Sequence, residues 1–389
     1  MTLTSILDDR KRLKELDSGD MLGIVEKSPG FMDWCIESMA RVQKTRIIEK
    51  VSNYISRGKL KGIFVVGMGG SAISGDLLRD WLQDAMDIPI IVVRGYSLPV
   101  YITNHYLGIF LSYSGNTEET LSCFADAIER EVTCIGITSG GLLASFLERV
   151  NGLCIHLPSG YQPRAALLYL FTALAILMAG TGIVPEEKII TELEETSAIL
   201  HTLASECGRE STVNENPMKQ AALKVFKTII AIYGHGCLVS VARRLKGQIN
   251  ENGKNPAYHD FFPELNHNET VGWEVAPDVS MHVSCILLRD EKQEAGSMGV
   301  RVRYTKGILE EKAAACINLV ARGTSRLARM LSLVYMGDFM SIYLAFLNGK
   351  DPTPVTYIQG LKEELKNKVH VQEEIKARVE RIIQQQDER

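Results

Sequence analysis

The sequence of 389 residues predicts an α/β protein with parallel sheets flanked by helices and with helical segments at both ends. Three observations indicate this class. Short, continuously apolar runs alternate with longer helical patterns, as expected for strands buried on both faces. An apolar run, a glycine-rich turn and a helix follow one another at residues 62–82, and the same succession recurs at 228–249. The chain is also too long for one ordinary core, so we expect two related modules.

The first half of the chain contains the elements of the first module. Residues 1–50 are expected to be helical, with a break at Pro29-Gly30. Apolar runs predict five strands, and the first leads through glycines into a helix: the strands at 63–66, 88–93, 107–111, 132–137 and 153–157, and the helix at 74–82. Residues 165–184 are almost continuously apolar and long enough to span a bilayer. Because this segment stands alone in a strand–helix alternation, we interpret it as a buried core helix.

The second half repeats the pattern and then ends in helices. After a charged helical stretch, an apolar run leads into Gly234-His-Gly236 and a helix at 238–249. Further strands are expected at 279–288 and 316–320, and helices at 336–346 and 358–386. An apolar stripe marks the last helical segment: Leu361, Leu365, Val369, Ile375, Val379 and Ile382. This stripe can pack on its own body or on a partner chain, and the sequence leaves both open.

These patterns divide the chain into five expected segments. They are an N-terminal helical segment at 1–50, a first subdomain at 51–185, a helical connection at 186–222, a second subdomain at 223–335 and C-terminal helices at 336–389. The opening strand, turn and helix are the part that is clearly repeated, so the duplication is inferred from that unit.

The composition is that of a globular protein, with 46% hydrophobic residues, 23% charged residues and a net charge of −4. That balance favours neither nucleic acid nor a membrane as partner. The eight cysteines are scattered, without a Cys-x-x-Cys pair or a histidine cluster at zinc spacing. We therefore expect no metal site, and buried free thiols in a reducing cytoplasm. The charged N-terminus does not resemble a signal peptide.

A glycine-rich turn follows the first strand, at Gly67-Met-Gly69-Gly70-Ser71. Such a turn leaves backbone N–H groups at a helix start, where the helix dipole favours an anion. The same residues fit a dinucleotide fingerprint. NAD would require an acidic residue at the end of the next strand, but that strand ends in Val93-Arg94. An NADP-dependent oxidoreductase therefore stays open, and NAD loses support.

A second polar loop follows the third strand, at Ser112-Tyr-Ser114-Gly-Asn-Thr117. Its hydroxyls and main-chain amides can bind a terminal phosphate without metal or lysine. Taken alone, either loop is more simply explained as an ordinary helix cap. Two such loops at the carboxyl ends of strands in one sheet instead indicate a single ligand site. We call this site the phosphate cradle, formed by Gly69, Gly70, Ser71, Ser112, Ser114 and Thr117.

The second module contributes a carboxylate and an imidazole, Glu251 and His267. Glu and His are the pair needed to move protons at near-neutral pH, one as base for a C–H proton and the other as acid or base for a ring oxygen. Each has a simpler explanation, since Glu251 can pair with its own helix and His267 can be a surface histidine. Base, acid and phosphate anchor together indicate sugar-phosphate chemistry.

At this point the motifs resemble those of the bifunctional phosphoglucose/phosphomannose isomerases, which are sugar isomerase (SIS) domain proteins. The resemblance runs from about residue 17 to residue 362 and is carried by residues 67–76, 112–117, 162–166, 250–252, 264–269 and 337–345. It implies two SIS-type, flavodoxin-like subdomains with parallel sheets flanked by helices. It also implies a homodimer with shared active sites and no metal or other cofactor.

The resemblance further implies a reaction and a role for each candidate residue. The reaction is reversible isomerisation of glucose 6-phosphate, and of mannose 6-phosphate, to fructose 6-phosphate through a cis-enediolate. The phosphate cradle is implied to hold the phosphate, and Arg164 to stabilise the enediolate. Glu251 is implied to move a proton between C1 and C2. His267, from the neighbouring subunit, is implied to assist ring opening, and Lys362 to contact a substrate oxygen. Thr353 is a candidate for the small residue that leaves room for either configuration at C2 of the substrate.

Two rival functions are weighed against this one. A non-catalytic SIS-domain regulator that binds sugar phosphates would not need Glu251 and His267 together, and it would usually carry a DNA-binding helix-turn-helix, of which the N-terminal segment shows no sign. The NADP-dependent oxidoreductase is the second rival. Among the candidate residues, Lys362 is the one most simply explained as a solvated surface side chain, and Arg164 can snorkel from the end of its apolar helix.

Overall fold

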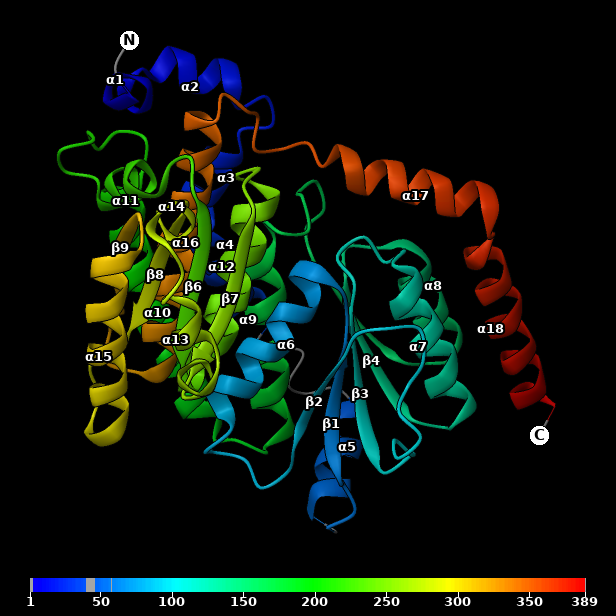
Figure 1. The fold of residues 1–389 in the computed structure, drawn as a ribbon. Helices are drawn as coiled ribbons and strands as arrows, with labels where there is room; N and C mark the ends of the chain where they lie inside the picture. The colour runs from blue at the N-terminus through cyan, green and yellow to red at the C-terminus, as the bar shows by residue number, and fades with distance from the viewer. Residues whose placement is uncertain (1–2, 40–45, 57, 389) are drawn as a thin grey trace. The chain divides into compact units, whose positions relative to one another are not determined.

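The computed structural model describes residues 3–39, 46–56 and 58–388, which form two compact units. Unit 1 comprises Met1–Gly30 and Glu192–Pro354, and unit 2 comprises Phe31–Thr191 and Val355–Arg389 (Figure 1). Each helical end of the chain is therefore divided between the units. The expected segments kept 1–50 and 336–389 whole, because periodicity locates helices along the chain but does not tell which sheet they cover.

Unit 2 contains a five-stranded parallel sheet in the order β2-β1-β3-β4-β5. Its strands are β1 (Gly62–Val66), β2 (Ile90–Val93), β3 (Tyr106–Leu111), β4 (Thr133–Thr138) and β5 (Leu153–His156). Its helices are α5 (Arg46–Ser56), α6 (Gly69–Leu82), α7 (Glu118–Glu129), α8 (Gly141–Arg149), α9 (Leu167–Thr181), α17 (Thr356–Lys368) and α18 (Val371–Asp387), while α4 (Pro29–Ser38) starts in unit 1. All five predicted strands are confirmed. The predicted helix at 74–82 is α6, which begins earlier because the glycines themselves form its first turn.

Unit 1 contains a four-stranded parallel sheet in the order β7-β6-β8-β9. Its strands are β6 (Ile229–His235), β7 (Ala257–Phe262), β8 (Val283–Arg289) and β9 (Ala315–Val320). In both sheets the first strand lies between the second and the third, so the predicted duplication is confirmed at the level of topology. Strand β7 was missed, since it is an edge strand whose residues are mostly polar or exposed and give no continuous apolar run.

The helices of unit 1 include several that the apolar patterns did not reveal. They are α1 (Leu3–Asp8), α2 (Arg10–Leu16), α3 (Met21–Lys27), α11 (Pro217–Val225), α12 (Val239–Glu251), α13 (Glu269–Gly272), α14 (Pro277–Ser280), α15 (Gly296–Lys312) and α16 (Arg326–Leu347), with α10 (Glu186–Cys207) starting in unit 2 and the short 3-10 turns η2 (Gly236–Leu238) and η3 (Glu264–His267). Helix α15 lacks a clear apolar face, and α16 starts ten residues before the predicted 336 (336 − 326).

Two apolar helices raise the question of a membrane. The segment expected at 165–184 is α9, and nearly all of its side chains are buried within unit 2. Among the described helices only α16 is long and apolar enough to cross a bilayer, and its apolar stretch is wholly buried in the protein. Both are what the core helix of a large α/β protein requires, and the interpretation of 165–184 as a core helix is confirmed.

The last two helices answer the question that the apolar stripe left open. The stripe is split by a turn at Val369 and His370, where His370 has a positive φ. In α18 the side chains of Ile375, Val379 and Ile382 are buried in a core cluster with residues of α7, so this half packs on its own body. In α17 no residue is buried, and Leu361 stays exposed.

All eight cysteines are free thiols, six of them buried and two half-buried. Burial raises the pKa of the Cys35, Cys123 and Cys207 thiols to about 12. Burial likewise raises the pKa of Cys154 and of Cys316 to about 11. Thiols with such pKa values carry almost no thiolate at neutral pH and are poor nucleophiles. The expectation of buried free thiols is confirmed for six of the eight cysteines.

Candidate functional site

The turn after β1 forms the first half of the phosphate cradle. Helix α6 begins at Gly69, directly after the extended residue Met68, and no side chain caps its start. Within the described residues, the N–H groups of Gly69 and Gly70 have no protein acceptor, and Ser71 follows as a buried hydroxyl. An uncapped start of a 14-residue helix presents unpaired N–H donors and a positive dipole end. This is a strong local setting for an anion.

Gly70 is required here because another segment of backbone passes directly over it. A Cβ at Gly70 would lie 3.1 Å from the carbonyl oxygen of Pro163 and 3.2 Å from the Cα of Arg164. The candidate cation Arg164 is therefore rooted beside the start of α6, although it lies far along the sequence. Its side chain is 3% exposed, so it does not snorkel to solvent.

The loop after β3 forms the second half of the cradle. Strands β1 and β3 are parallel neighbours, so their carboxyl ends and the loops that follow them meet at one edge of the sheet. The Ser112 Oγ lies 3.0 Å from the Thr117 Oγ1. Thr117 is the residue before α7, yet its hydroxyl makes no capping hydrogen bond to that helix. Thr117 therefore occupies the N-cap position of α7 without the side-chain hydrogen bond of an ordinary cap.

The shape of this loop is set by a turn that the sequence interpretation missed. Gly115 has a φ of 69°, and a Cβ there would lie 1.7 Å from the carbonyl oxygen of Gly140. The N–H of Ser139 donates to the carbonyl of Tyr113 at 2.9 Å, and the N–H of Leu143 to that of Gly115 at 3.0 Å. The pair Gly140-Gly141 after an apolar strand was the available signal, since it repeats the pattern of the other two loops.

The NADP alternative depended on Arg94, which follows β2. In the structure, the Arg94 guanidinium forms an ion pair with the carboxylate of Asp76, whose side chain is 1% exposed. Arg79 also pairs with Asp76, at 3.3 Å. A buried carboxylate needs such partners, so Arg94 is engaged by the protein itself and is a poor candidate for a nucleotide 2′-phosphate.

In unit 1, Glu251 is the last residue of α12 and is half-buried. The Lys254 ammonium just beyond it donates to the carbonyl oxygen of Glu251 at 2.5 Å and to those of Pro352 and Pro354 at 3.2 and 2.5 Å. This single lysine ties the end of α12 to the segment that contains Thr353. The sequence interpretation did not single out Lys254, whose signal was its position three residues after Glu251.

His267 and Glu251 lie at opposite ends of the strands of the same sheet, His267 at the carboxyl ends and Glu251 at the amino ends. Helix α12 starts after the carboxyl end of β6 and runs back, so Glu251 at its end precedes the amino end of β7. His267 ends η3, which follows the carboxyl end of β7, and its side chain is exposed. A strand of six residues spans about 20 Å. One copy of unit 1 therefore does not bring these two residues together.

Comparison with known proteins identifies the family. Residues 214–365 match the model of the bacterial phospho-glucose isomerase C-terminal SIS domain. The chain is 40% identical to the bifunctional phosphoglucose/phosphomannose isomerase of Caldicellulosiruptor bescii over 327 residues, which are 84% of this chain and 96% of that protein. It is 37% identical to the enzyme of the same name from Aquifex aeolicus, over 79% and 91% of the two chains. The chain belongs to the bifunctional phosphoglucose/phosphomannose isomerase family.

The fold agrees with this family assignment. A hypothetical protein of Thermus thermophilus superposes with a TM-score of 0.66 over 94% of both chains, at 16% identity. The C-terminal domain of a glucosamine-fructose-6-phosphate aminotransferase from Francisella tularensis gives 0.63 over 85% of this chain and 96% of that one, at 15% identity. The two-sheet SIS architecture is therefore shared well beyond close sequence relatives, and the chain is an isomerase by family.

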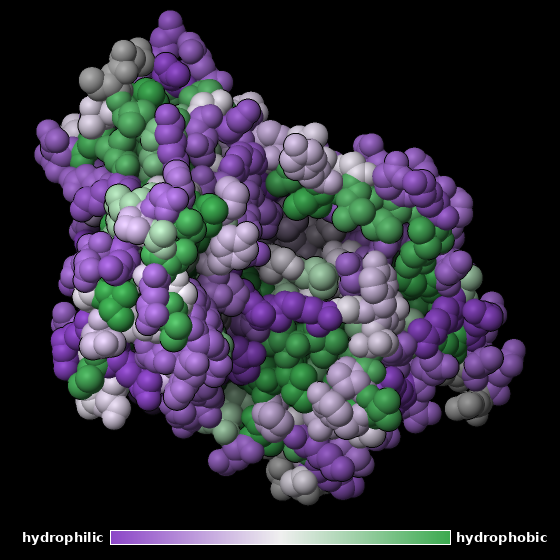
Figure 2. All heavy atoms as spheres, viewed as in Figure 1, coloured by the Kyte–Doolittle hydropathy of each residue, from purple (hydrophilic) through white to green (hydrophobic). Residues whose placement is uncertain are grey.

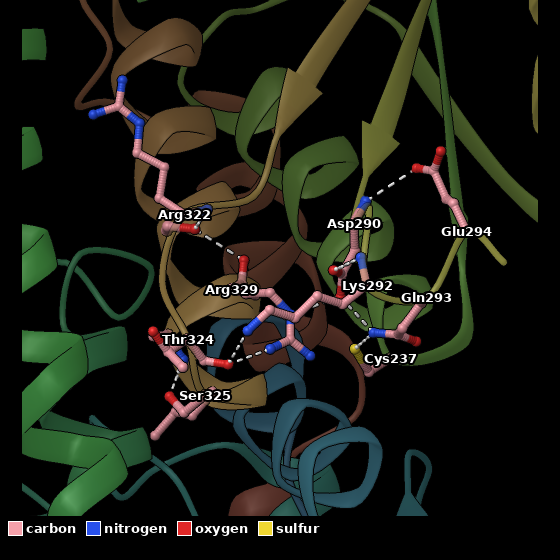
Figure 3. Close-up of polar contacts among 12 residues, drawn as sticks. Cys237, Asp290, Lys292, Gln293, Glu294, Arg322, Thr324, Ser325 and Arg329 are labelled. Atoms are coloured by element: carbon pink, nitrogen blue, oxygen red, sulfur yellow. Dashed lines mark hydrogen bonds and ion pairs between the residues drawn. The ribbon is translucent and has the colours of Figure 1, made fainter. Parts of the chain in front are cut away.

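In the second sheet of this isomerase, the loop after β8 does not repeat the serines and threonine of the loop after β3. The segment after β8 is acidic instead: Asp290 accepts from Arg329 at 2.9 Å and from the Gln293 side chain at 2.6 Å (Figure 3). Glu294 pairs with Arg289, and this partner lowers the pKa of Glu294 although burial raises it. Each of these carboxylates is thus paired with an arginine, Asp290 with Arg329 and Glu294 with Arg289.

The remaining polar residues of the motifs have other surroundings. Burial lowers the pKa of His235, which is 3.5 Å from Glu294 and not exposed. Burial raises the pKa of Glu269, and its carboxylate accepts a hydrogen bond from the hydroxyl of Tyr233. Both groups are therefore held inside unit 1. Lys362 is exposed on α17. The described residues contain no group of three or more His, Cys, Asp or Glu that could hold a metal.

Proposed function

We propose that this chain interconverts fructose 6-phosphate with glucose 6-phosphate and mannose 6-phosphate through a cis-enediolate. The observation that carries the proposal is the phosphate cradle of unit 2. Two helices start there without a side-chain cap after neighbouring strands, and the start of α6 lies beside the backbone of Arg164. The two substrates are taken from the relatives' names. One site can act on both, because both aldose phosphates give the same enediolate once the C2 proton is removed.

Each candidate residue has a role that its chemistry supports. The cradle holds the phosphate, and Arg164 provides the fixed cation for charge that develops on the enediolate oxygens. Glu251 transfers the proton between C1 and C2, and His267 assists ring opening. Lys362 contacts a substrate oxygen, and Thr353 leaves room for either configuration at C2.

We also propose that the active form is a homodimer in which His267 is supplied by the partner subunit. The support is that Glu251 and His267 lie at opposite edges of one sheet. The segment after His267 also exposes apolar side chains, with Val271 64% and Val279 53% exposed. We place the protein in the cytoplasm, where eight free cysteines stay reduced.

A coupled assay tests the proposal. Purified protein with fructose 6-phosphate should yield both glucose 6-phosphate and mannose 6-phosphate, and EDTA should not change either rate. Glu251→Gln should lower kcat by roughly 100-fold or more, since removing a general base typically costs a factor of that order. Glu311→Gln on α15 of the same unit is the matched control, since the Glu311 side chain is 71% exposed, and it should keep wild-type kcat.

The possible results separate the candidate functions. Binding of fructose 6-phosphate without turnover would support the sugar-phosphate-binding regulator instead. Reduction of NADP would support the oxidoreductase. If Glu251→Gln kept wild-type kcat, another residue would have to be the base.

A further inference from the structure

Helix α18 is a part of the chain that the proposed chemistry does not use. It begins at Val371, beyond residue 365 where the family model ends. Its apolar face is nevertheless built into unit 2, since Ile375, Val379, Ile382 and Ile383 share a core cluster with Phe124 of α7 and Phe146 of α8. Figure 1 shows α18 running beside α7. The helix is therefore a structural part of the module that carries the phosphate cradle.

Polar contacts fix α18 along α7 and reach the cradle itself. The Arg378 guanidinium binds the carboxylate of Asp126 at 2.8 Å and also that of Glu129. One turn before the first buried residue, the Gln372 Nε2 donates to the carbonyl oxygen of Asn116 at 3.0 Å. Asn116 lies inside the Ser112–Thr117 loop, so α18 contacts the phosphate cradle through this one amide.

Through the geometry of the peptide bond, this contact sets the direction of a backbone N–H group in the cradle. A trans peptide is planar, and its C=O and N–H point in opposite directions. Because the hydrogen bond from Gln372 fixes the direction of the Asn116 carbonyl, it also fixes the direction of the Thr117 N–H, which is opposite. The same relation holds for the Tyr113 carbonyl, which Ser139 holds, and the N–H of Ser114. Within the described chain these two N–H groups, of Ser114 and Thr117, have no protein acceptor.

We propose that Gln372 is a positioning residue that orients the Thr117 amide for the substrate phosphate, and that α18 is the brace that holds Gln372 in place. Gln372 does not touch the substrate in this proposal and acts only through Asn116. The inference rests on the proposed function, because it takes the cradle to be the phosphate site. It assigns the C-terminal helix a part in substrate affinity, whereas proton transfer stays with Glu251.

Substitution of Gln372 by methionine tests the proposal. Gln372→Met keeps the length and helix propensity of the side chain but removes the donor. Gln385→Met is the matched control, since Gln385 is an exposed glutamine of the same helix. The measurements are the dissociation constant of inorganic phosphate by calorimetry, KM and kcat for fructose 6-phosphate, and the melting temperature, all on the full chain.

The expected result is a split between affinity and turnover. Gln372→Met should weaken phosphate binding and raise KM by about 2- to 10-fold, the value of one ordinary hydrogen bond, with kcat and the melting temperature unchanged. Gln385→Met should match the wild type in every measurement. Wild-type phosphate affinity in Gln372→Met would overturn this inference alone. A loss of kcat together with a lower melting temperature would also overturn it, because that is the signature of a purely structural contact. Failure of the wild-type protein to bind phosphate would overturn the proposed function as well.

Discussion

The phosphate cradle depends on single residues whose backbone, more than their side chains, decides the geometry. Gly70 allows the backbone of Pro163 and Arg164 to pass close to the start of α6. Gly115 allows the second loop to pass under Gly140. Both positions are glycine because a Cβ has no room there, and both bring a chemically important neighbour into place.

A methyl group at Gly70 should therefore impair substrate binding. Gly70→Ala places its Cβ against backbone atoms that cannot rotate away, so the Arg164 segment or the helix start must shift. Overpacking of this kind costs about 1–3 kcal/mol, and because the strain falls on the site, KM for fructose 6-phosphate should rise by roughly 5- to 150-fold. Steady-state kinetics measure this directly.

Gly307→Ala is the control for this substitution. It lies in the interior of α15, and nothing is within 4 Å of its added Cβ. Replacing an open helical glycine by alanine stabilises a helix, so Gly307→Ala should keep wild-type KM. An unchanged KM in Gly70→Ala would contradict the account of the close approach.

At the scale of elements, the same helical pattern has two different outcomes at the end of the chain. The predicted helix at 358–386 is two helices, and the positive φ of His370 marks the break. Helix α18 buries its stripe against α7, whereas α17 carries Lys362 and buries nothing. The two helices have the same amphipathic periodicity. Whether the apolar face of each is buried therefore depends on which part of the protein lies next to it.

A charge in the buried face of α18 should detach it from α7. Val379 is 0% exposed, so Val379→Asp puts a carboxylate among apolar side chains without a partner. The cost is about 3 kcal/mol. The melting temperature should fall by several degrees, and phosphate affinity should fall with it because Gln372 loses its support.

The neighbouring exposed residue Ala377 gives the matched substitution. Ala377→Asp introduces the same charge on the solvent side of the same helix and should leave both the melting temperature and phosphate affinity near their wild-type values. Equal melting temperatures for the two variants would mean that α18 does not contribute to the core of unit 2.

At the scale of the whole molecule, the arrangement of unit 1 supports the proposed homodimer. Glu251 and His267 belong to opposite edges of a sheet, and the segment after His267 exposes Val271, Val275 and Met281. Green, hydrophobic spheres are interspersed with purple, hydrophilic ones on the face shown in Figure 2. A second copy of the chain is the partner we expect there, since it would cover this apolar surface and supply His267.

Mixing two inactive variants tests whether His267 acts across subunits. Glu251→Gln and His267→Ala should each be nearly inactive alone. If His267 is supplied by the partner, half of the randomly mixed dimers carry one intact site out of two, so about a quarter of wild-type activity should return. Activity of the mixture after subunit exchange is the measurement, with light scattering to establish the dimer.

Two results would contradict a site shared between subunits. No recovery in mixtures shown to contain heterodimers would mean that both residues act within one chain. A monomer at the concentration of the assay, with full activity, would exclude the shared site.

Much of this protein was determined by its sequence alone. The described residues form nine strands in the two sheets. Eight of these strands were predicted from apolar runs, because strands buried on both faces must be apolar. The candidate residues of the phosphate cradle were also predicted, since glycines and hydroxyls after neighbouring strands meet at one edge. Strand β7 was missed for the converse reason, because an edge strand is free to be polar.

Other features were decided only by the tertiary structure. The contact of Gly70 with Arg164, the bond from Gln372 to Asn116 and the tie from Lys254 to the Thr353 segment all join residues that no local pattern relates. Periodicity reports which face of an element is apolar, but not which distant segment covers it. That choice depends on shape and on the pairing of buried polar groups, which exist only once the chain is folded.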